Sequence, residues 1–300
     1  MDKRILIIYY SQSGQLKQIA ENFCKPFVAA GAEVDWYKVT PENDFPFPWD
    51  ETKFFDAMPE SVLGLPMPLK SNFVQHTTYD LVVFAYQPWF LSPSIPATSA
   101  LKSEAVKKLL IKTPVVTLVG ARNMWINAQQ KVKQLLFEAK ANHVGNIVLT
   151  DKNPNLISAI TIQHWLYSGK KDRMWGVFPL PGVADRDIQS AHVYGEIVKT
   201  HLENNKLGTL QAALIQAKAV QVRHILMFIE GRAGMLFSIW ANAILKKKNR
   251  SLWLKIFKYY LMFALFLLSP IVILIYVLIL APLSLSSIKK KKAYNEGVNL

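Results

Sequence analysis

Residues 4–15 read Arg-Ile-Leu-Ile-Ile-Tyr-Tyr-Ser-Gln-Ser-Gly-Gln, an apolar run that stops at a short turn of small and hydroxyl-bearing residues. The run predicts a buried strand, and an amphipathic helical pattern follows it directly. Ser11, Ser13 and Gly14 then lie between the carboxyl end of a strand and the amino end of a helix. Backbone N–H groups, hydroxyls and the helix dipole converge at such a junction. We therefore expect a cradle for an anionic phosphate here.

The alternation of strand and helix continues beyond this junction. Short runs rich in branched residues predict five strands, at 5–10, 33–39, 80–86, 114–119 and 146–150. Apolar positions that return every three or four residues predict helices at 15–30, 97–111, 126–142, 156–168 and 185–203. Strands that are apolar on both faces and separated by helices are typical of a parallel sheet covered on both sides. The predicted fold class is α/β, with a doubly wound five-stranded parallel sheet.

A long insertion, residues 40–78, separates the second and third predicted strands. It contains six prolines and several aromatic residues, and it shows no sustained period. One interpretation is an irregular surface excursion that is packed by Phe45, Phe47 and Trp49. The other is a lid over the site, because long loops in compact domains often carry function. The sequence leaves both open.

Basic charge is concentrated in the last third of the chain. The 300 residues have a formal net charge of +14, and residues 207–300 hold 13 Lys or Arg against 2 Asp or Glu, which is +11 and leaves +3 for residues 1–206. These charges flank apolar stretches and are not interleaved with exposed aromatic residues, so the pattern favours a membrane surface over nucleic acid. The single cysteine, Cys24, fits a reducing, cytoplasmic compartment, and no Cys or His spacing predicts a metal site.

Four regions are expected from these patterns: an α/β domain at 1–206, an amphipathic basic helical region at 207–258, a membrane-inserted segment at 259–288 and a basic tail at 289–300. Residues 259–288 contain no charged side chain and are long enough to span a bilayer as a helix. Both flanks are basic, however, whereas a single crossing normally leaves one side richer in Lys and Arg. A single span and a re-entrant hairpin that turns at Pro270 or Pro282 therefore both remain open.

Three loops should meet at the carboxyl edge of the sheet, where ligands bind in doubly wound folds. The first has the pattern Ser11-Gln12-Ser13-Gly14-Gln15. It resembles the phosphate loop of the flavodoxin-like family, from which Gln15 departs, and the resemblance covers about residues 3–205. That resemblance implies FMN, with its phosphate in the first loop and its ring between the other two. The two remaining loops contribute these candidate cofactor-binding residues: Gln87, Pro88, Trp89 and Phe90, then Gly120, Ala121, Arg122, Asn123 and Trp125.

These residue types suit a flat, redox-active ring. Such a ring needs apolar or aromatic faces that exclude water, together with a few hydrogen-bond donors for the charge of its reduced form. Trp89 and Phe90 could provide a face. Arg122 and Asn123 could donate to ring carbonyls or to substrate oxygens.

A closer resemblance involves the opening Ile-Tyr-Tyr-Ser-Gln-Ser-Gly-Gln at residues 8–15, the segment 120–129 and the basic, apolar carboxyl tail. These features are similar to the dialkylresorcinol condensing enzymes of aryl-polyene and flexirubin pigment pathways. The resemblance implies conversion of a dialkyl cyclohexanedione to a dialkylresorcinol. Condensation itself normally needs a nucleophilic cysteine, and Cys24 lies late on the first predicted helix, away from the strand ends. We therefore expect a flavin-dependent aromatase, with a ketosynthase as a separate partner.

The acid and base of this chemistry have no recognisable motif. Arg122 is a candidate to hold an enolate oxygen, and His164 or Tyr86 is a candidate proton acceptor. An NAD(P)H-dependent quinone reductase fits the same fold and membrane location. A third possibility is a flavodoxin-like electron carrier or membrane scaffold without turnover. In each case we expect a membrane-associated protein with its soluble domain in the cytoplasm.

Overall fold

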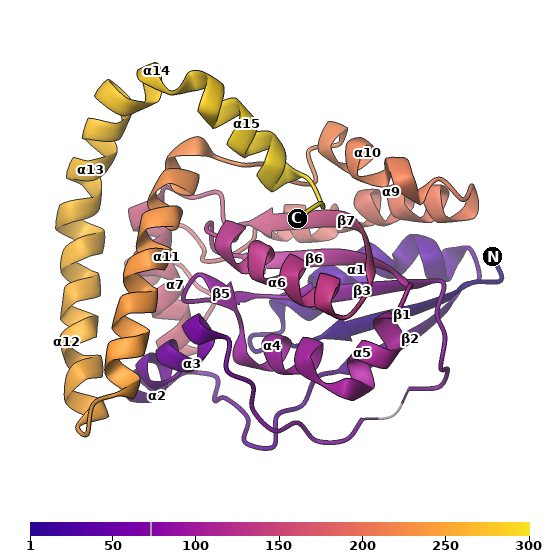
Figure 1. Cartoon of the computed structure of the whole chain (residues 1–300), viewed down its shortest axis with the longest axis horizontal. Coiled ribbons are helices and arrows are strands. Elements are labelled where there is room, and N and C mark those ends of the chain that lie inside the picture. The colour runs from indigo at the N-terminus through magenta and orange to yellow at the C-terminus, as the bar shows by residue number, and fades with distance from the viewer. Residues whose placement is uncertain (73) are drawn as a thin grey trace.

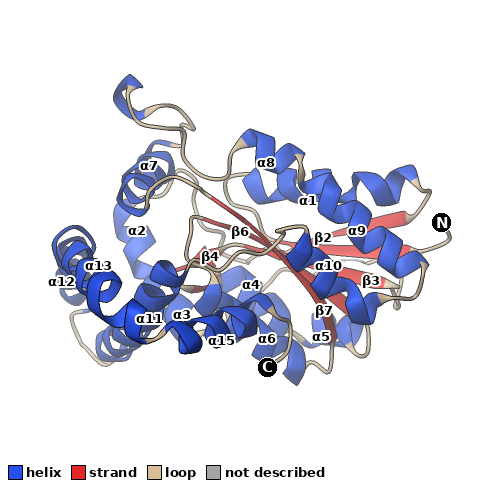
Figure 2. Ribbon diagram, turned by 90° about the horizontal axis from the view of Figure 1, so that it is seen from above, coloured by secondary structure: helices blue, strands red, loops and turns tan. Residues whose placement is uncertain are grey.

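The computed structural model describes residues 1–300 with the exception of residue 73, and its centre is a five-stranded parallel sheet (Figures 1 and 2). The strand order is β2-β1-β3-β6-β7. Ile5 of β1, the second strand in this order, pairs with Val34 of β2 on one side and with Leu81 of β3 on the other. This order is that of flavodoxin-like doubly wound folds, so the predicted fold class is confirmed. The strands are β1 (Arg4–Tyr9), β2 (Glu33–Lys38), β3 (Leu81–Tyr86), β6 (Pro114–Ala121) and β7 (Asn142–Thr150).

Helices cover both faces of the sheet, which explains why its strands are apolar on both sides (Figure 2). In β3, Val82 and Phe84 pack in one core, whereas Leu81 and Val83 pack in the other. The first face is covered by α4 (Ile95–Lys102), α5 (Glu104–Leu110) and α6 (Ile126–Glu138). The second face is covered by α1 (Gln15–Ala29), α8 (Asp185–Gln189), α9 (Ala191–Glu203) and α10 (Leu210–Gln216).

Further elements gather at the carboxyl edge of the sheet. The insertion, for which the sequence predicts no sustained period, contains α2 (Glu51–Asp56) and α3 (Met58–Leu63). A short antiparallel hairpin of β4 (Pro88–Trp89) and β5 (Ser92–Pro93) follows β3. The helix α7 (Asn155–Ser168) follows β7. Two single 3-10 turns, η1 (Met174–Gly176) and η2 (Leu207–Thr209), lie in the connections on either side of α8 and α9.

The α/β domain extends further along the chain than the predicted boundary at residue 206. Leu210 and Leu214 of α10 are fully buried against the sheet, and Val220 and Val222 belong to the opposite core. The N–H of Val148 in β7 donates to the carbonyl of Ala219 at 2.8 Å. Because β7 is an edge strand, its free backbone groups and its outer face need such cover. The predicted region 207–258 is therefore not a separate unit.

The tail forms an antiparallel pair of helices at the carboxyl edge of the sheet (Figure 1). The first is α11 (His224–Leu245), which packs against α3. A continuous helical rod, 250–283, then runs back beside it. The rod comprises α12 (Arg250–Phe263), the π-helical turn η3 (Ala264–Leu268), α13 (Ser269–Ile275), the second π-helical turn η4 (Tyr276–Leu280) and α14 (Ala281–Leu283). It is followed by α15 (Leu285–Glu296), which returns the chain to the domain next to β7 (Figure 1).

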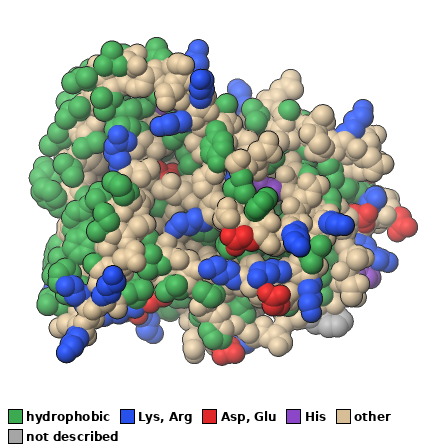
Figure 3. Space-filling model, viewed as in Figure 1, with side chains coloured by type: hydrophobic (Ala, Val, Ile, Leu, Met, Phe, Trp, Pro, Cys, Tyr) green, Lys and Arg blue, Asp and Glu red, His purple; other side chains and the backbone are tan. Residues whose placement is uncertain are grey.

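The outer side of this rod is apolar and uncovered. Large hydrophobic side chains stay exposed along it, including Phe263, Leu267, Leu274, Leu278 and Leu283. Figure 3 shows hydrophobic side chains gathered over α12 and α13, with Lys and Arg towards both ends of the rod. By length and composition the 34-residue helix could span a membrane. Exposed apolar patches of this extent mark an interaction surface.

Close packing of α1 on α9 predicts a strong effect of Gly195→Ala. A Cβ at Gly195 would lie 2.0 Å from the carbonyl oxygen of Phe23, so the two helices must separate. We expect a loss of about 1–3 kcal/mol in the free energy of unfolding, as for other overpacked sites. Gly231→Ala in α11 is the matched control, because a Cβ added at Gly231 would have no atom within 4 Å. For this variant we expect a slightly higher free energy of unfolding, since alanine favours the helix. Chemical denaturation of both variants checks this, and equal effects would contradict it.

Candidate functional site

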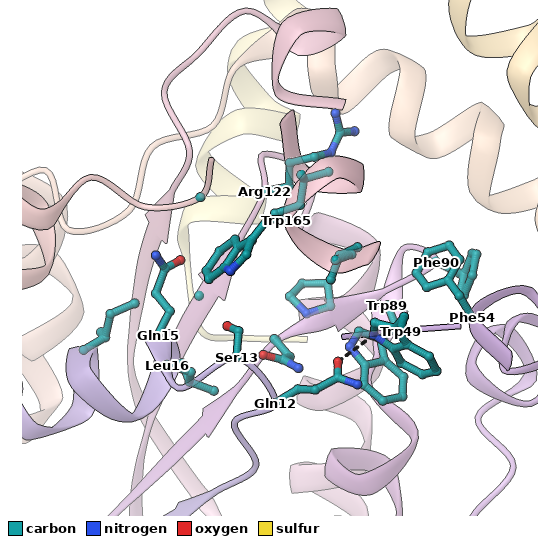
Figure 4. A pocket seen from close by; sticks show the side chains of 18 residues that line it. Gln12, Ser13, Gln15, Leu16, Trp49, Phe54, Trp89, Phe90, Arg122 and Trp165 are labelled. Carbon is teal, nitrogen blue, oxygen red and sulfur yellow. Dashed lines mark hydrogen bonds between the residues drawn. The ribbon is translucent and has the colours of Figure 1, made fainter. Parts of the chain in front are cut away.

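The strand-to-helix junction after β1 has the geometry of an anion cradle. Gly14 adopts φ 84°, a left-handed conformation that suits glycine, and α1 begins at the next residue. The Ser11 Oγ accepts the N–H of Lys17 at 3.2 Å. The other N–H groups of the first turn have no partner within the helix, as at any helix start. The Ser13 side chain lines the adjoining cavity, so the open N–H groups and this hydroxyl share one site (Figure 4).

Gln15, which departs from the family's pattern, holds a distant loop against the cradle. Its Nε2 donates to the carbonyl of Val183 at 3.2 Å, and its Oε1 accepts the N–H of Val183 at 3.0 Å. Gly182 makes this approach possible, because a Cβ there would lie 2.7 Å from the Trp165 ring and 2.9 Å from the Gln15 Oε1. The Gln15 side chain thus shapes the wall of the site, and one N–H of its amide is used in this contact.

A cavity of about 230 Å³ adjoins the cradle and has aromatic walls. Trp165 lies on one side, and Trp49 and Trp89 lie on the other (Figure 4). The Trp49 Nε1 donates to the Gln12 Oε1 at 2.8 Å, and the Trp49 and Trp89 rings meet edge to face at 5.3 Å. Its wall is completed by residues from all three predicted loops: Ser13, Gln15, Gln87, Pro88, Phe90, Gly120, Ala121 and Arg122. Ser11 and Gly14 lie beside it in the cradle.

Two parts of this wall come from segments outside the three predicted loops. Trp49 and Phe54 belong to the insertion, which therefore forms part of the cavity and is more than a surface excursion. The aromatic residues of the insertion were the available signal for this. Trp165 comes from α7, whose predominantly apolar sequence gave no indication of which side faces a ligand.

The loop after β3 holds Phe90 in a strained turn. Phe90 and Leu91 adopt φ 46° and 61°, and both are bulky residues in the left-handed region. This costs on the order of 1–3 kcal/mol for each such residue, and such strain is concentrated at functional sites. The Phe90 ring packs against Phe54 at 4.9 Å between centroids. Gln87 precedes this turn and lines the cavity, where its side chain can meet a ligand.

Arg122 is turned differently from the sequence prediction. Its guanidinium points away from Ser13 and Gln12 (Figure 4). Its Nη1 donates to the main-chain oxygen of Asn155 at 3.0 Å and to the Asn155 Oδ1 at 3.2 Å. Burial lowers the pKa of Arg122 to about 10, so the guanidinium stays charged at neutral pH. Arg122 can therefore donate hydrogen bonds at the far end of the cavity.

Asn123 and Trp125 do not line the cavity, contrary to the prediction for this loop. The Asn123 Nδ2 donates to the Asn155 Oδ1 at 2.9 Å. Trp125 is 3% exposed and packs in the core at the start of α6. The chain enters α6 shortly after Arg122. The side chains of Asn123 and Trp125 therefore lie below the loop and not at the cavity.

The two predicted proton acceptors also lie elsewhere. Tyr86 is fully buried and its hydroxyl donates to the Gln129 Oε1 at 2.7 Å, on the α6 side of the sheet. Burial raises the pKa of Tyr86 well above 10, which leaves the phenol protonated. The imidazole of His164 is paired with Asp172 at 2.7 Å, and His164 does not line the cavity although it lies on α7. Successive side chains of β3 point to opposite faces of the sheet, which places Tyr86 on the α6 side. The rotation of α7 about its axis turns His164 away from the cavity.

A buried carboxylate from the tail supports the Arg122 loop, and the sequence reasoning missed it. Glu230 of α11 is 1% exposed, and its Oε1 accepts the N–H of Asn127 at 2.7 Å in the first turn of α6. The Asn127 Nδ2 in turn donates to the carbonyl of Glu230 at 2.8 Å. Burial raises the pKa of Glu230 to about 7, although the N–H groups of α6 and the charge of Arg122 favour the carboxylate. One acidic residue in an apolar helix was the available signal.

Comparison with known proteins finds similarity only among solved structures. No family model matches the chain, and no curated protein sequence matches it. A flavoprotein in complex with FMN from Lactobacillus acidophilus is 19% identical with a TM-score of 0.41, over 49% of this chain and 93% of that chain. Two-electron reduced flavodoxin from Megasphaera elsdenii is 14% identical with a TM-score of 0.30, over 51% and 89%. NAD(P)H:quinone oxidoreductase from Methanothermobacter marburgensis is 10% identical with a TM-score of 0.31, over 58% and 100%.

The environment of Glu230 predicts a specific pH dependence of stability. Its pKa rises from 4.5 to about 7 on folding, so the protonated carboxyl stabilises the fold fully below about pH 4.5, and this stabilisation is lost as the pH rises through 7. Between about pH 5 and 8, we expect the free energy of unfolding of the wild type to fall by about 2–3 kcal/mol more than that of Glu230→Gln. Chemical denaturation across this range measures the difference, and parallel curves for the two proteins would refute the assignment.

Proposed function

We propose that this protein is an FMN-dependent oxidoreductase. The observation that carries the proposal is the direct contact between an anion cradle and an aromatic-walled cavity at the carboxyl edge of the sheet. The phosphate would bind at Ser11, Ser13, Gly14 and the N–H groups of the first turn of α1. The flat ring would lie between Trp165 and the pair Trp49 and Trp89. The left-handed Gly14 leaves open space beside the cradle, which fits this arrangement.

FMN, when bound, supplies an acceptor or donor of hydride next to the substrate. The aromatic side chains exclude water from the site, and the Gln87 amide offers hydrogen bonds to a ring edge. The described residues that line the cavity include no carboxylate, imidazole or thiol. The chain therefore acts on its substrate by orientation and hydrogen bonding, with Arg122 as the charged donor.

The proposed reaction is the aromatisation of a dialkyl cyclohexanedione to a dialkylresorcinol. Aromatisation removes a hydride and a proton from neighbouring ring carbons, and tautomerisation then gives the resorcinol. The hydride would pass to bound FMN, and the proton, which leaves a carbon alpha to a carbonyl, would pass to solvent. The enolate that forms on loss of this proton needs stabilised oxygens. Arg122 provides such stabilisation, since its guanidinium stays charged and forms none of the ion pairs found among the described residues. A ketosynthase would make the cyclic diketone beforehand. The alternatives are an NAD(P)H-dependent quinone reductase and a non-enzymatic electron carrier or scaffold.

Ser13 provides the test of the cofactor. We expect the full-length protein to be purified yellow, with one FMN per chain. Ser13→Asp should weaken FMN binding about a hundredfold or more, because a carboxylate in the cradle repels the phosphate by several kcal/mol. Ser13→Thr keeps the hydroxyl and serves as the control with near-normal affinity. Absorption spectra and FMN titrations measure both variants, and a wild-type protein that neither contains nor binds FMN would rule out the proposal.

The same yellow preparation separates the candidate reactions. Under anaerobic conditions, bleaching by a dialkyl cyclohexanedione alone supports aromatisation. Bleaching by NAD(P)H alone, with reoxidation by a quinone, supports the reductase instead. A flavin that neither compound reduces supports the electron carrier.

We infer that the protein attaches to the cytoplasmic face of a membrane through the apolar rod, which lies along the surface. At the start of the rod, Arg250 binds Glu60 at 2.6 Å and Asp56 at 2.7 Å on the insertion of the α/β domain. Beyond its end, the Gln211 Nε2 donates to the carbonyl of Glu296 at 2.6 Å. Both ends are thus fixed to the same domain, which disfavours a single crossing.

The length of the rod and its charges agree with this attachment. Its 34 residues span about 51 Å, well beyond the roughly 30 Å of a hydrocarbon core. Lysines and arginines lie at both ends, at 246–250 and 289–292. Basic clusters of this kind bind anionic lipids of the cytoplasmic leaflet. An apolar face between basic ends is typical of a helix that lies in the interface.

Labelling from one side of a vesicle tests this orientation. Lys290→Cys lies beyond the rod and Glu203→Cys lies on the domain, while the native Cys24 is buried and will not react. We expect a membrane-impermeant maleimide to label both introduced cysteines in inside-out membrane vesicles and neither in right-side-out vesicles. Labelling of the two positions from opposite sides would establish a single crossing.

A further inference from the structure

A second cavity of about 260 Å³ separates the cofactor site from the apolar rod. Ala159 and Ile162 of α7 form one wall, and Ala233 of α11 forms another. Leu261 and Leu265 of the rod close the outer side. Most of this surface is aliphatic or aromatic, so the cavity is suited to an apolar group.

The second cavity adjoins the aromatic cavity. The two share part of their lining, and the shared residues are Phe54, Pro88, Phe90, Arg122, Ile162 and Leu166. The strained turn at Phe90 and Leu91 fixes one side of this junction. A ligand that fills both spaces would therefore pass between the Phe54 and Phe90 rings and the Arg122 side chain.

Polar groups are confined to few positions of the second cavity. Asn155 lines it, and the Asn155 Nδ2 is buried without a hydrogen-bond partner among the described residues. Its Oδ1 is already engaged by Arg122 and Asn123, which fixes the orientation of the amide. A buried donor without a partner is costly, and a ligand oxygen would satisfy it after a small shift of the surrounding side chains, because the Nδ2 itself exposes almost no surface. Arg122 lies at the same end and also donates.

Only one helix, the rod, lies between this cavity and the outer apolar surface. Leu261 and Leu265 face the cavity, while Phe263 and Leu267 are each 56% exposed on the outside. The π-helical turn at 264–268 and Pro270 interrupt the regular hydrogen-bond ladder at this point. Such π-turns are frequent at functional sites.

We propose that the second cavity binds the apolar chain of the substrate, with an oxygen of its cyclic head group at Arg122 and Asn155. This inference rests on the proposed function and names the substrate class of that site: an amphiphile with a carbonyl-bearing ring and a long alkyl chain. Relative to water, each buried methylene contributes about 0.8 kcal/mol, so the cavity can hold the chain without exposing it to solvent. The substrate enters from the lipid leaflet beside the rod.

Photolabelling tests the position of the chain without any need for redox activity. The probe is a dodecyl benzoquinone with a diazirine near the end of its chain, added to full-length protein in lipid nanodiscs. We expect cross-links at residues of α11 and the rod that line the cavity, such as Ala233, Leu261 and Leu265, and none at the outward-facing Phe263 and Leu267. Ala233→Trp should reduce these cross-links at least tenfold by filling the space. Ile239→Trp places the same ring on the exposed face of α11, where Ile239 is 59% exposed, and should leave labelling unchanged.

A second probe, with the diazirine on the quinone ring, tests the position of the head group. It should label residues 122–124 or 155. Cross-links confined to the outer face of 271–285, the absence of cross-links, or labelling that Ala233→Trp does not reduce would overturn the proposal. As a control, the protein is labelled with a photoreactive fatty acid in the presence of unlabelled quinone. If the fatty acid labels the same residues equally well and the quinone does not displace it, the cavity holds a structural lipid, and the proposal is overturned. Flavin content, read from the same samples, reports separately on the proposed function.

Discussion

Five parallel strands with helices on both faces leave one approach to the sheet, the crevice at their carboxyl ends. In this chain the crevice receives a cradle from the loop after β1, a strained hairpin after β3 and a donor loop after β6. The insertion and α7 add the aromatic walls. The remaining helices of the chain, α11 and the rod, also pack at this edge (Figure 1). A single edge of the sheet thus brings together the anion cradle, the aromatic cavity and the apolar rod.

The tail is coupled to this edge by charged groups that hydrophobic packing alone would not require. Glu230 joins α11 to the first turn of α6, and Arg250 joins the rod to the insertion. The Glu230 carboxyl loses solvation when it is buried, and the N–H groups of α6 only partly offset this loss, which is why its pKa rises. The apolar face of α11 could pack in several registers against a neighbour. A buried directional contact selects one of them, so the tail helices hold a defined position beside the Arg122 loop.

The sequence was sufficient to predict the sheet, its helices and the three loops, because strand hydrophobicity and helical period are local properties of the chain. It could not predict which side of a loop or helix faces the crevice. Trp125 follows Arg122 by three residues and lies in the core, while Trp165 comes from a helix with no clear polar face and lines the cavity. The sequence also did not predict that α10, beyond residue 206, is buried on β7, because this burial is a tertiary contact and the basic composition of the tail gives no sign of it.

The position of the rod has a consequence for the substrate. A lipophilic molecule that leaves a bilayer for a water-exposed site loses about 0.8 kcal/mol for each methylene that becomes hydrated. Leu261 and Leu265 line a cavity, whereas Phe263 and Leu267 lie on the outer face, so in the proposed binding mode the alkyl chain would exchange one apolar environment for another. Only the oxygen-bearing head would change its surroundings, and the Asn155 amide and the Arg122 guanidinium would compensate it there. The site would then discriminate between substrates mainly by the head group at Arg122. Moving the alkyl chain from the membrane into the cavity would contribute little net free energy.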